Sequence, residues 1–201
     1  MVRRHGHFAN SMGYLQRHWQ TFGLIGLFAG MSVFFLVLPM QTIVDHIGSD
    51  NAFIIMFVVA MIGGMTTFSG VPYQFLLIGF VHAGMSPIAL GTVTAFGIMA
   101  GDSTSYLVGR QSTKLFSPRI TRALQRIADI LTRHPQWVFP VLFVYGSISP
   151  LSNDFIVISL GLARYSYWRT IIPLLLGNIV YHIGIAYLGV FAYQSIMNFF
   201  N

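Results

Sequence analysis

The sequence predicts an all-α polytopic membrane protein, built around an inverted repeat of two opposed re-entrant helical hairpins. Of the 201 residues, 55% are hydrophobic and only 8% are charged, whereas a soluble domain carries about 25% charged residues. Long apolar runs recur along the chain, and two of them are interrupted near their centres. These observations predict one membrane domain, residues 1–201, with no soluble domain beside it.

Six segments are expected along this domain, and each hairpin is followed by a full transmembrane helix. In order, they are an N-terminal transmembrane helix at 21–39, hairpin 1 at 53–82, a transmembrane helix at 86–108, a cytoplasmic amphipathic helix at 118–133, hairpin 2 at 137–161 and a transmembrane helix at 170–197. The first run lacks the small-residue cleavage site of a signal peptide, so we expect it to be retained. Residues 41–51 are polar and are expected to form a loop.

Hairpin 1 is predicted from an apolar run that is too long and too broken for one straight membrane helix, which takes about 20 residues. Glycines and Pro72 interrupt the run, and Pro72 lacks an N–H and disfavours helical geometry at Val71. Backbone groups freed by such a break cannot face lipid and must be buried in protein or line a wet cavity. We expect the chain to enter with 53–65 and leave with 74–82, with one kinked helix as the alternative. The motif GSISPLSND breaks hairpin 2 in the same way.

The basic residues favour this topology, because cytoplasmic loops are enriched in lysine and arginine. Six of the eleven basic residues lie between Arg110 and Arg133. If hairpin 1 crossed the membrane fully, this block would lie outside. Two hairpins that do not cross instead place all eleven basic residues on the cytoplasmic side, with the N-terminus inside and the C-terminus outside.

The two predicted halves are opposed, because each is a broken segment followed by one full span and they enter from opposite sides. A sequence echo supports the repeat, since Gly101-Asp102 in the first span corresponds to Gly177-Asn178 in the second. Inverted repeats with discontinuous helices are the architecture of many transporters, whose binding sites lie where the breaks meet.

An amphipathic helix is predicted between the halves. Ser117-Pro118 is typical of a helix start, and apolar residues then recur on one face at Ile120, Leu124, Ile127 and Leu131. The arginines mostly avoid that face, and they are Arg119, Arg122, Arg126 and Arg133. We expect this helix to lie in the cytoplasmic interface, where each arginine near anionic headgroups adds ~1 kcal/mol of attraction. A soluble connector helix is the alternative.

Three motifs stand out in and after the breaks: FSGVPYQ at 68–74, GDSTSYLVGR at 101–110, and SISPLSND with GLARYSYWR within 147–169. They resemble, in that order, F-P-P-x-P-S-E, G-D-x-x-x-Y-x-x-G-R and R-F-x-P-x-x-R…A-G-x-x-x-M-x-x-x-x-F of the DedA family, also called the VTT or SNARE-associated Golgi protein family. Gly177-Asn178 stands in the family's N-x-x-G region.

The resemblance covers about 53–191. It implies a multi-pass protein of the cell (inner) membrane with two opposed re-entrant loops. Such a protein would scramble phospholipids or return undecaprenyl phosphate across the membrane, and it would not be an enzyme or need a cofactor.

Four positions depart from the family pattern. Bacterial members commonly carry two glutamates in the first element and two arginines in the second, where this chain has Met65, Gln74, Ser147 and Asn153. The chain has no glutamate at all. The second break is similar to the polar, arginine-free loops of the family's eukaryotic scramblase branch. This similarity implies a passive groove rather than a proton-driven pump.

The residues expected to line a polar translocation groove lie in the two breaks and the two following spans. They are Pro72, Gln74, Asp102, Tyr106, Arg110, Pro150, Asn153, Asp154 and Asn178. Asp102 lies in or near a membrane span, where a carboxylate is costly and by default functional; an ion pair with Arg110 is the alternative. Asp154 is expected to cap the helix after the second break, to contact substrate, or both.

The same residues bear on other functional classes. A proton- or ion-coupled small-solute transporter fits the inverted repeat equally well. An intramembrane serine protease would need Ser147 or Ser149 within hydrogen-bond reach of His182, which the sequence does not indicate. A purely structural assembly factor leaves the costly Asp102 and Asp154 unexplained. Nucleic-acid binding is disfavoured because the positive charges flank apolar segments, and the seven histidines show no metal-ligand spacing.

Overall fold

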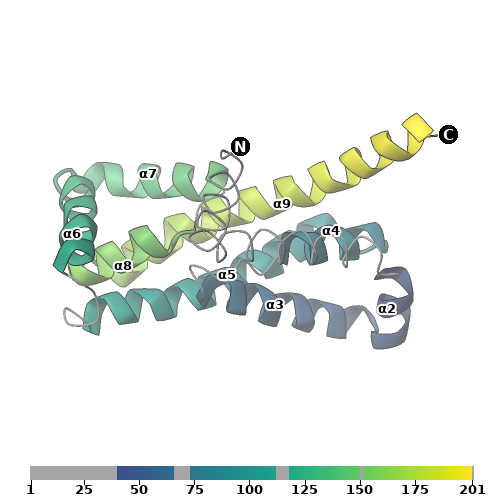
Figure 1. Cartoon of the computed structure of the whole chain (residues 1–201), viewed down its shortest axis with the longest axis horizontal. Helices are drawn as coiled ribbons and strands as arrows, with labels where there is room; N and C mark the ends of the chain where they lie inside the picture. Colours follow the sequence, from purple (N-terminus) through teal and green to yellow (C-terminus); the bar gives the residue numbers. More distant parts are fainter. Residues whose placement is uncertain (1–39, 66–72, 112–117, 150–151, 201) are drawn as a thin grey trace, which may run out of the picture. The chain divides into compact units, whose positions relative to one another are not determined.

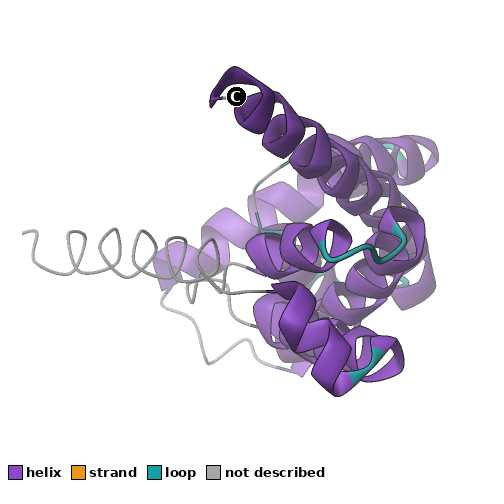
Figure 2. Cartoon of the chain, turned by 90° about the vertical axis from the view of Figure 1, so that its right-hand side faces the viewer, coloured by secondary structure: helices purple, strands orange, loops and turns teal. Residues whose placement is uncertain are grey.

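The computed structural model describes residues 40–65, 73–111, 118–149 and 152–200. The chain divides into two compact units, Met1–Leu38 and Pro39–Asn201, and the described residues belong to the second. The predicted transmembrane helix at 21–39 therefore lies outside the described residues, as do the turn of hairpin 1 and part of the break in hairpin 2. All regular structure in the described ranges is helical, which confirms the all-α class (Figures 1 and 2).

In the described residues, each broken run forms a longer helix followed by a shorter one. The helices are α2 (Met40–Ile47), α3 (Ser49–Met65), α4 (Tyr73–His82), α5 (Pro87–Gln111), α6 (Pro118–Thr132), α7 (Pro135–Ile148), α8 (Asp154–Leu162) and α9 (Tyr167–Phe200). The return helices α4 and α8 have 10 and 9 residues. At 1.5 Å per residue, neither is long enough to cross the ~30 Å hydrocarbon core of a bilayer.

The predicted loop at 41–51 is wrong, because these residues form α2 and the first turn of α3. The apolar residues Ile43, Val44 and Ile47 recur with helical spacing and are partly buried, while the polar residues between them face outward. Gly48, with φ of +79°, joins α2 to α3 through a backbone conformation that glycine adopts readily. The polar composition of this stretch concealed its amphipathic spacing.

In the first half, α3 and α5 run parallel with their backbones in close contact. A Cβ on Gly97 would lie 2.5 Å from the carbonyl oxygen of Phe57, and one on Gly101 would lie 2.5 Å from that of Met61. Later residues of α5 thus meet later residues of α3. Gly64 meets the backbone of Ile98 in the same interface. Glycines at these sites allow the two helices to approach more closely than side chains would permit.

The second half repeats this packing with α7 and α9, which also run side by side in one direction (Figure 1). Gly146 of α7 contacts Leu174 and Gly177 of α9, and Gly177 contacts Phe143 in return. Gly177 of α9 thus contacts α7, just as Gly101 of α5 contacts α3 in the first half. This is the tertiary counterpart of the sequence echo between the two Gly-Asp and Gly-Asn pairs.

Each return helix reverses direction and packs on the long final helix of the other half. α8 runs along α5, since Asn153 meets Asp102 and Gly161 meets Tyr106 and Arg110. α4 likewise runs along α9, with Ile78 against Gly189. Figure 1 shows the result: the two helix–break–helix hairpins point toward each other from opposite ends of this unit.

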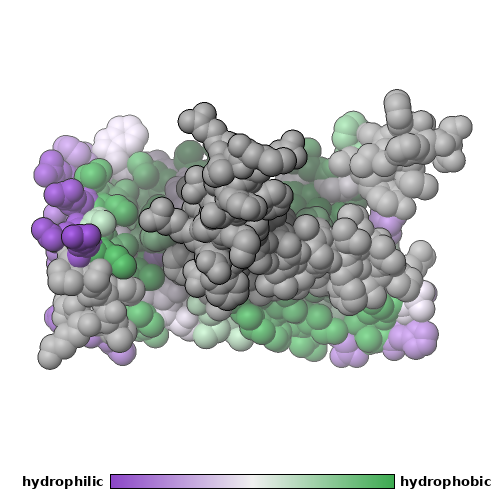
Figure 3. Space-filling model, viewed as in Figure 1, coloured by the Kyte–Doolittle hydropathy of each residue, from purple (hydrophilic) through white to green (hydrophobic). Residues whose placement is uncertain are grey.

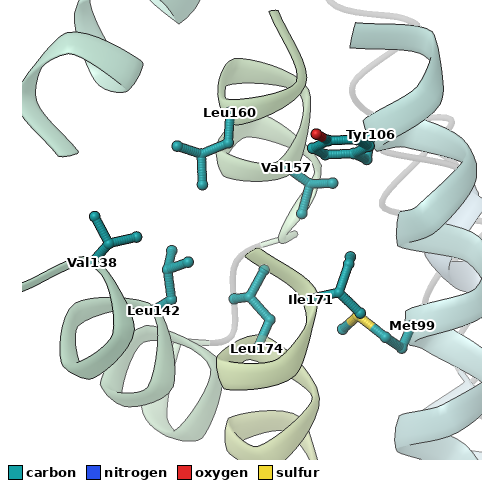
Figure 4. Close-up of a cluster of buried hydrophobic side chains, with 8 residues drawn as sticks. All are labelled: Met99, Tyr106, Val138, Leu142, Val157, Leu160, Ile171 and Leu174. Carbon is teal, nitrogen blue, oxygen red and sulfur yellow. The ribbon is translucent and has the colours of Figure 1, made fainter. Parts of the chain in front are cut away.

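A hydrophobic core joins α5, α7, α8 and α9. Figure 4 shows its eight buried residues, which are Met99, Tyr106, Val138, Leu142, Val157, Leu160, Ile171 and Leu174. Large apolar side chains are also exposed on the outside of the helices, including Ile54, Trp137, Ile148, Trp168, Leu188 and Phe191. Within the described residues, only the segment Tyr167–Phe191 of α9 is both long and apolar enough to cross a membrane. The 25-residue α5 is long enough, but its buried polar and small residues lower its mean hydropathy.

The described basic residues lie together at one end of the helices. Four of the eleven basic residues lie outside the described ranges, and the other seven lie together where α5 and α8 end and α7 and α9 begin, at Arg110, Arg119, Arg122, Arg126, Arg133, Arg164 and Arg169. We call this the arginine end. Asp45 and Asp50 lie at the opposite end, on α2 and α3. Figure 3 shows hydrophilic residues at the two sides of the view and apolar residues between them.

Candidate functional site

Three buried hydroxyl side chains are satisfied by the backbone of their own helix or of the residue before it. The hydroxyls of Thr94, Ser159 and Thr170 each donate to the carbonyl oxygen four residues earlier. Such bonds need no partner from another element and carry no indication of a site. The buried polar residues that are joined to other helices, directly or through a neighbour, are Asp102, Asn153, Asp154, Asn178 and His182.

Asp102 and Asn153 join α5 to the start of α8. Asp102 lies in the middle of α5 with 1% of its surface exposed, and Asn153 Nδ2 donates to Asp102 Oδ2 over 2.8 Å. Arg110, the alternative partner, is exposed and lies eight residues further on, about 12 Å along the helix. The buried carboxylate is therefore stabilised by an amide from the second break rather than by the arginine on its own helix.

Asp154 extends this cluster. It is also 1% exposed and occupies the first turn of α8, where a negative charge is favourable to the helix dipole. Ser152 Oγ donates to Asp154 Oδ2 over 2.7 Å, and the Asp154 N–H lies 3.2 Å from the same hydroxyl oxygen. The N-cap residue is Asn153, and its side chain bonds Asp102 rather than the helix start. Asp154 directly follows Asn153, which bonds Asp102, and all three side chains are buried.

A second polar contact joins α9 to the start of α4. His182 is buried, and its Nδ1 lies 2.7 Å from the carbonyl oxygen of Asn178, which can only accept. In the neutral imidazole, Nε2 then accepts from the Tyr73 hydroxyl, 3.4 Å away. The two rings are tilted, with their centroids 5.7 Å apart. Asn178 itself donates to the carbonyl oxygen of Leu174, so it reaches α4 only through His182.

The two contacts occupy corresponding positions in the two predicted halves. In each half, the residue at the start of the return helix bonds the long helix of the other half, through Asn153 to Asp102 and through Tyr73 to His182. The Tyr73 ring lies against Gly63 of α3, and the next residue of α3, Gly64, contacts Gly101 beside Asp102. The described flanks of both breaks thus converge on one polar region around the middle of α5.

The structure places the other predicted site residues apart from this region or leaves them undescribed. Tyr106 lies in the hydrophobic core, where its hydroxyl donates to the Tyr165 carbonyl and its ring meets Tyr167 edge-on at 5.3 Å. Arg110 is exposed at the arginine end, and Gln74 is partly buried in the first turn of α4. The two prolines of the predicted groove, Pro72 and Pro150, lie outside the described residues.

Sequence reasoning missed Tyr73 and His182 as site residues. His182 follows Asn178 by four residues and therefore shares its helix face, which was the available signal. The serine–histidine pair that a protease would need is not formed by Ser147, whose hydroxyl donates to the Phe143 carbonyl over 2.7 Å. Both ring nitrogens of His182 are engaged by Asn178 and Tyr73.

Comparisons of the chain with protein-family models, with curated proteins and with solved structures gave no match. The resemblance to the DedA family therefore stays a prediction from the three motifs. Any function assigned to the chain depends on the geometry of the polar region and of the hairpins around it.

Proposed function

We propose that this chain is an integral membrane protein that moves lipid headgroups between leaflets along a polar path between its two hairpins. The observation that carries the proposal is that the start of each return helix reaches the middle of the long final helix of the other half, through Asn153 to Asp102 and through Tyr73 to His182. Opposed discontinuous helices that meet at mid-depth are the arrangement in which many transporters bind substrate. The described parts of the DedA-like motifs, at 73–74, 101–110, 147–149 and 152–169, lie in or beside the same helices.

The outer surface supports placement in a membrane. Large apolar side chains are exposed along α3, α5, α7 and α9, and hydrophilic residues gather at the two ends (Figure 3). The described arginines share one end, which the positive-inside rule assigns to the cytoplasm. In this placement each hairpin enters and leaves the membrane on the same side. Hairpin 1 does so from the outside and hairpin 2 from the cytoplasm. The protein would be a multi-pass protein of the cell membrane.

Translocation requires this path to open, because Asp102 and Asp154 are almost fully buried. When one return helix moves away from the long helix that it contacts, the polar region becomes accessible from one leaflet. The carboxylates, the amide of Asn153 and the ends of the short helices then replace part of the hydration that a headgroup loses. The acyl chains stay in lipid if the path opens sideways. Opening of the other hairpin exposes the same region to the opposite leaflet.

The candidate substrates are phospholipids and polyprenyl phosphates such as undecaprenyl phosphate. On α6, Leu124 and Ala128 are buried in the contact with neighbouring helices, while the predicted headgroup-binding arginines are exposed at Arg119, Arg122, Arg126 and Arg133. These arginines would hold anionic headgroups at the cytoplasmic surface through charge. The path itself contains no described arginine, which favours passive exchange over tight phosphate binding.

A proton- or ion-coupled transporter of small solutes is the second candidate. The observation that favours it is the burial of Asp102, Asn153 and Asp154 together, because a closed polar region suits a small solute or ion better than a lipid headgroup. The two candidates differ in what must move across the membrane and in whether an ion gradient changes the rate.

A lipid-flip assay in proteoliposomes, with and without a pH gradient, separates the two candidates. Passive translocation should let dithionite bleach more fluorescent lipid than the outer leaflet contains. The bleaching rate should be the same with and without the pH gradient. Asp102→Asn and Asp154→Asn should each slow bleaching about tenfold if the lost interaction is worth ~1.4 kcal/mol in the transition state. Insertion and yield should be unchanged.

Asp45→Asn is the matched control, because Asp45 is exposed on α2 and lies far from the polar region. It should flip lipid at the wild-type rate. Bleaching that equals that of protein-free vesicles would overturn lipid translocation. Wild-type rates in both path variants would show that the two carboxylates are structural.

A further inference from the structure

Two turns related by the inverted repeat share one backbone structure. Each lies between a return helix and the following long helix, and the chain reads Ala83-Gly84-Met85-Ser86 in one and Ala163-Arg164-Tyr165-Ser166 in the other. Their hydrogen bonds also match, with Gly84 N to Val81 O at 3.0 Å, Met85 N to Phe80 O at 3.2 Å, Arg164 N to Gly161 O at 2.9 Å and Tyr165 N to Leu160 O at 2.9 Å. Both are Schellman-type helix ends.

The residue that ends the helix differs between the two turns. This position requires a left-handed backbone, and glycine occupies it in most proteins because it has no Cβ to clash. Gly84 has φ of +90°, whereas Arg164 has φ of +54°. Arg164 is the one non-glycine residue with positive φ among the described residues. The second turn therefore carries backbone strain that the first turn avoids.

The Arg164 side chain does not offset this strain by packing, since it is exposed. Strained backbone that persists in a fold points to a functional constraint at that residue. Arg164 lies at the arginine end, close in sequence to Arg169 and to Trp168, which is 66% exposed. Exposed arginine and tryptophan at the border of an apolar surface are the residues that anchor proteins at membrane interfaces.

We propose that Arg164 binds the phosphate of an anionic lipid headgroup at the arginine end. The inference rests on the membrane placement in the proposed function, and it adds a headgroup site at the entrance of the second return helix. A guanidinium can donate two parallel hydrogen bonds to a phosphate, which an ammonium cannot. Arg164 follows the end of α8 and is exposed, and the other arginines at the arginine end add to the positive potential around it. The partner is a membrane lipid of negative charge.

A structural role predicts a different behaviour. A cation beyond the end of a helix can stabilise that helix through its dipole, and removal of Arg164 would then destabilise the protein. If Arg164 is instead retained for lipid binding, Arg164→Gly relieves the strain and should raise the thermal midpoint or leave it unchanged. Arg164→Asn is the second variant, because asparagine tolerates the left-handed region and carries no charge.

The binding test uses the full chain in mixed micelles with brominated phosphatidylglycerol or brominated phosphatidylcholine. Bromine on the acyl chains quenches tryptophan, and Trp137 and Trp168 are both exposed toward the arginine end. Wild type should favour phosphatidylglycerol. Arg164→Asn should lower this preference roughly fivefold, which corresponds to one arginine near an anionic surface. Arg164→Lys keeps the charge but not the two parallel hydrogen bonds, so its preference should lie between those of the wild type and Arg164→Asn. Gly84→Asn, at the symmetry-related turn, should keep all of the preference.

Each outcome bears on the proposal. A preference for phosphatidylglycerol that Arg164→Asn leaves unchanged overturns it, and so does a lower thermal midpoint in both the Gly and Asn variants with no change in preference. Loss of preference with an unchanged or higher midpoint supports it. If Arg164→Asn loses the preference for phosphatidylglycerol but the wild type flips no lipid, only lipid translocation is overturned. If the wild type flips lipid but Arg164→Asn keeps the preference, only the headgroup site is overturned.

Discussion

The two return helices occupy equivalent places in the predicted inverted repeat, but they are held differently. α8 approaches α5 backbone to backbone, because Gly109 meets Ile158 and Gly161 meets Tyr106 and Arg110. A buried amide–carboxylate bond of 2.8 Å adds to this contact. α4 meets α9 through side chains instead.

On the α4 side, the contact that Gly189 makes is with the side chain of Ile78 rather than with backbone. The polar bond between Tyr73 and His182 is long, at 3.4 Å. Close backbone packing gains contacts along the whole interface and loses them together when the helices separate. The difference indicates that hairpin 1 is the more easily displaced of the two, although the architecture of the halves is the same.

The largest expected effect concerns the opposed entry of the hairpins. The chain has no cysteine, so Ser49→Cys on α3 and Gln111→Cys at the end of α5 provide single labelling sites. The start of α3 and the end of α5 lie at opposite ends of the helices. A membrane-impermeant maleimide should therefore label one of these two cysteines in intact cells and the other only after lysis. Asp45→Cys is the control and should label with Ser49→Cys. Labelling of positions 49 and 111 from one side would remove the inverted arrangement.

The next effect sharpens the contrast in helix packing. Gly161→Ala places a Cβ against the backbone of Tyr106 and Arg110, which cannot move without shifting α5 or α8. We expect a loss of about 1–3 kcal/mol in the free energy of unfolding. Gly189→Ala places its Cβ against the Ile78 side chain, which can change rotamer, so the loss should be smaller. Thermal unfolding in detergent, followed by circular dichroism, measures both; equal losses would show that the two return helices are held alike.

The smallest effect separates the two polar contacts. Asn153→Ala leaves the buried Asp102 without the amide donor, which should cost about 1–3 kcal/mol of stability. Tyr73→Phe removes only the long bond to His182 and should cost less than about 1 kcal/mol. If opening of hairpin 1 limits translocation, Tyr73→Phe also speeds lipid flipping by up to about fivefold, since 1 kcal/mol corresponds to that factor. A larger stability loss in Tyr73→Phe than in Asn153→Ala would reverse the assignment of the looser hairpin.

The helices and their breaks were predictable from sequence because their causes are local. The missing N–H of Pro72 and the cluster of polar residues before Asp154 interrupt apolar runs whatever surrounds them. The amphipathic face of α6 was likewise visible in the spacing of Leu124 and its neighbours. α2 was missed because eight residues of mixed polarity give a weak periodic signal, and its burial depends on contacts with α3 and α4.

The candidate site was predictable only in part. Asp102, Asn153 and Asp154 were expected to share a site, and the structure brings them together. Tyr106 was expected in the same groove but lies in the core. It is four residues further along α5 than Asp102, and its hydroxyl bonds the turn that follows α8 rather than the start of α8. Tyr73 and His182 were not selected, because nothing in a linear sequence shows that residues 109 positions apart will meet.

The sequence by itself determined that the described chain is helical, where its apolar runs break and which charged residues are available, because composition, proline and periodicity act over a few neighbouring residues. Only the tertiary structure decided which helix each hairpin returns along, that Asn153 rather than Arg110 reaches Asp102, and that an arginine occupies the left-handed turn where the other half has glycine. These outcomes depend on contacts between distant segments. Such contacts are selected by packing the whole chain at once, through close approaches at residues such as Gly161 that local preferences do not reveal.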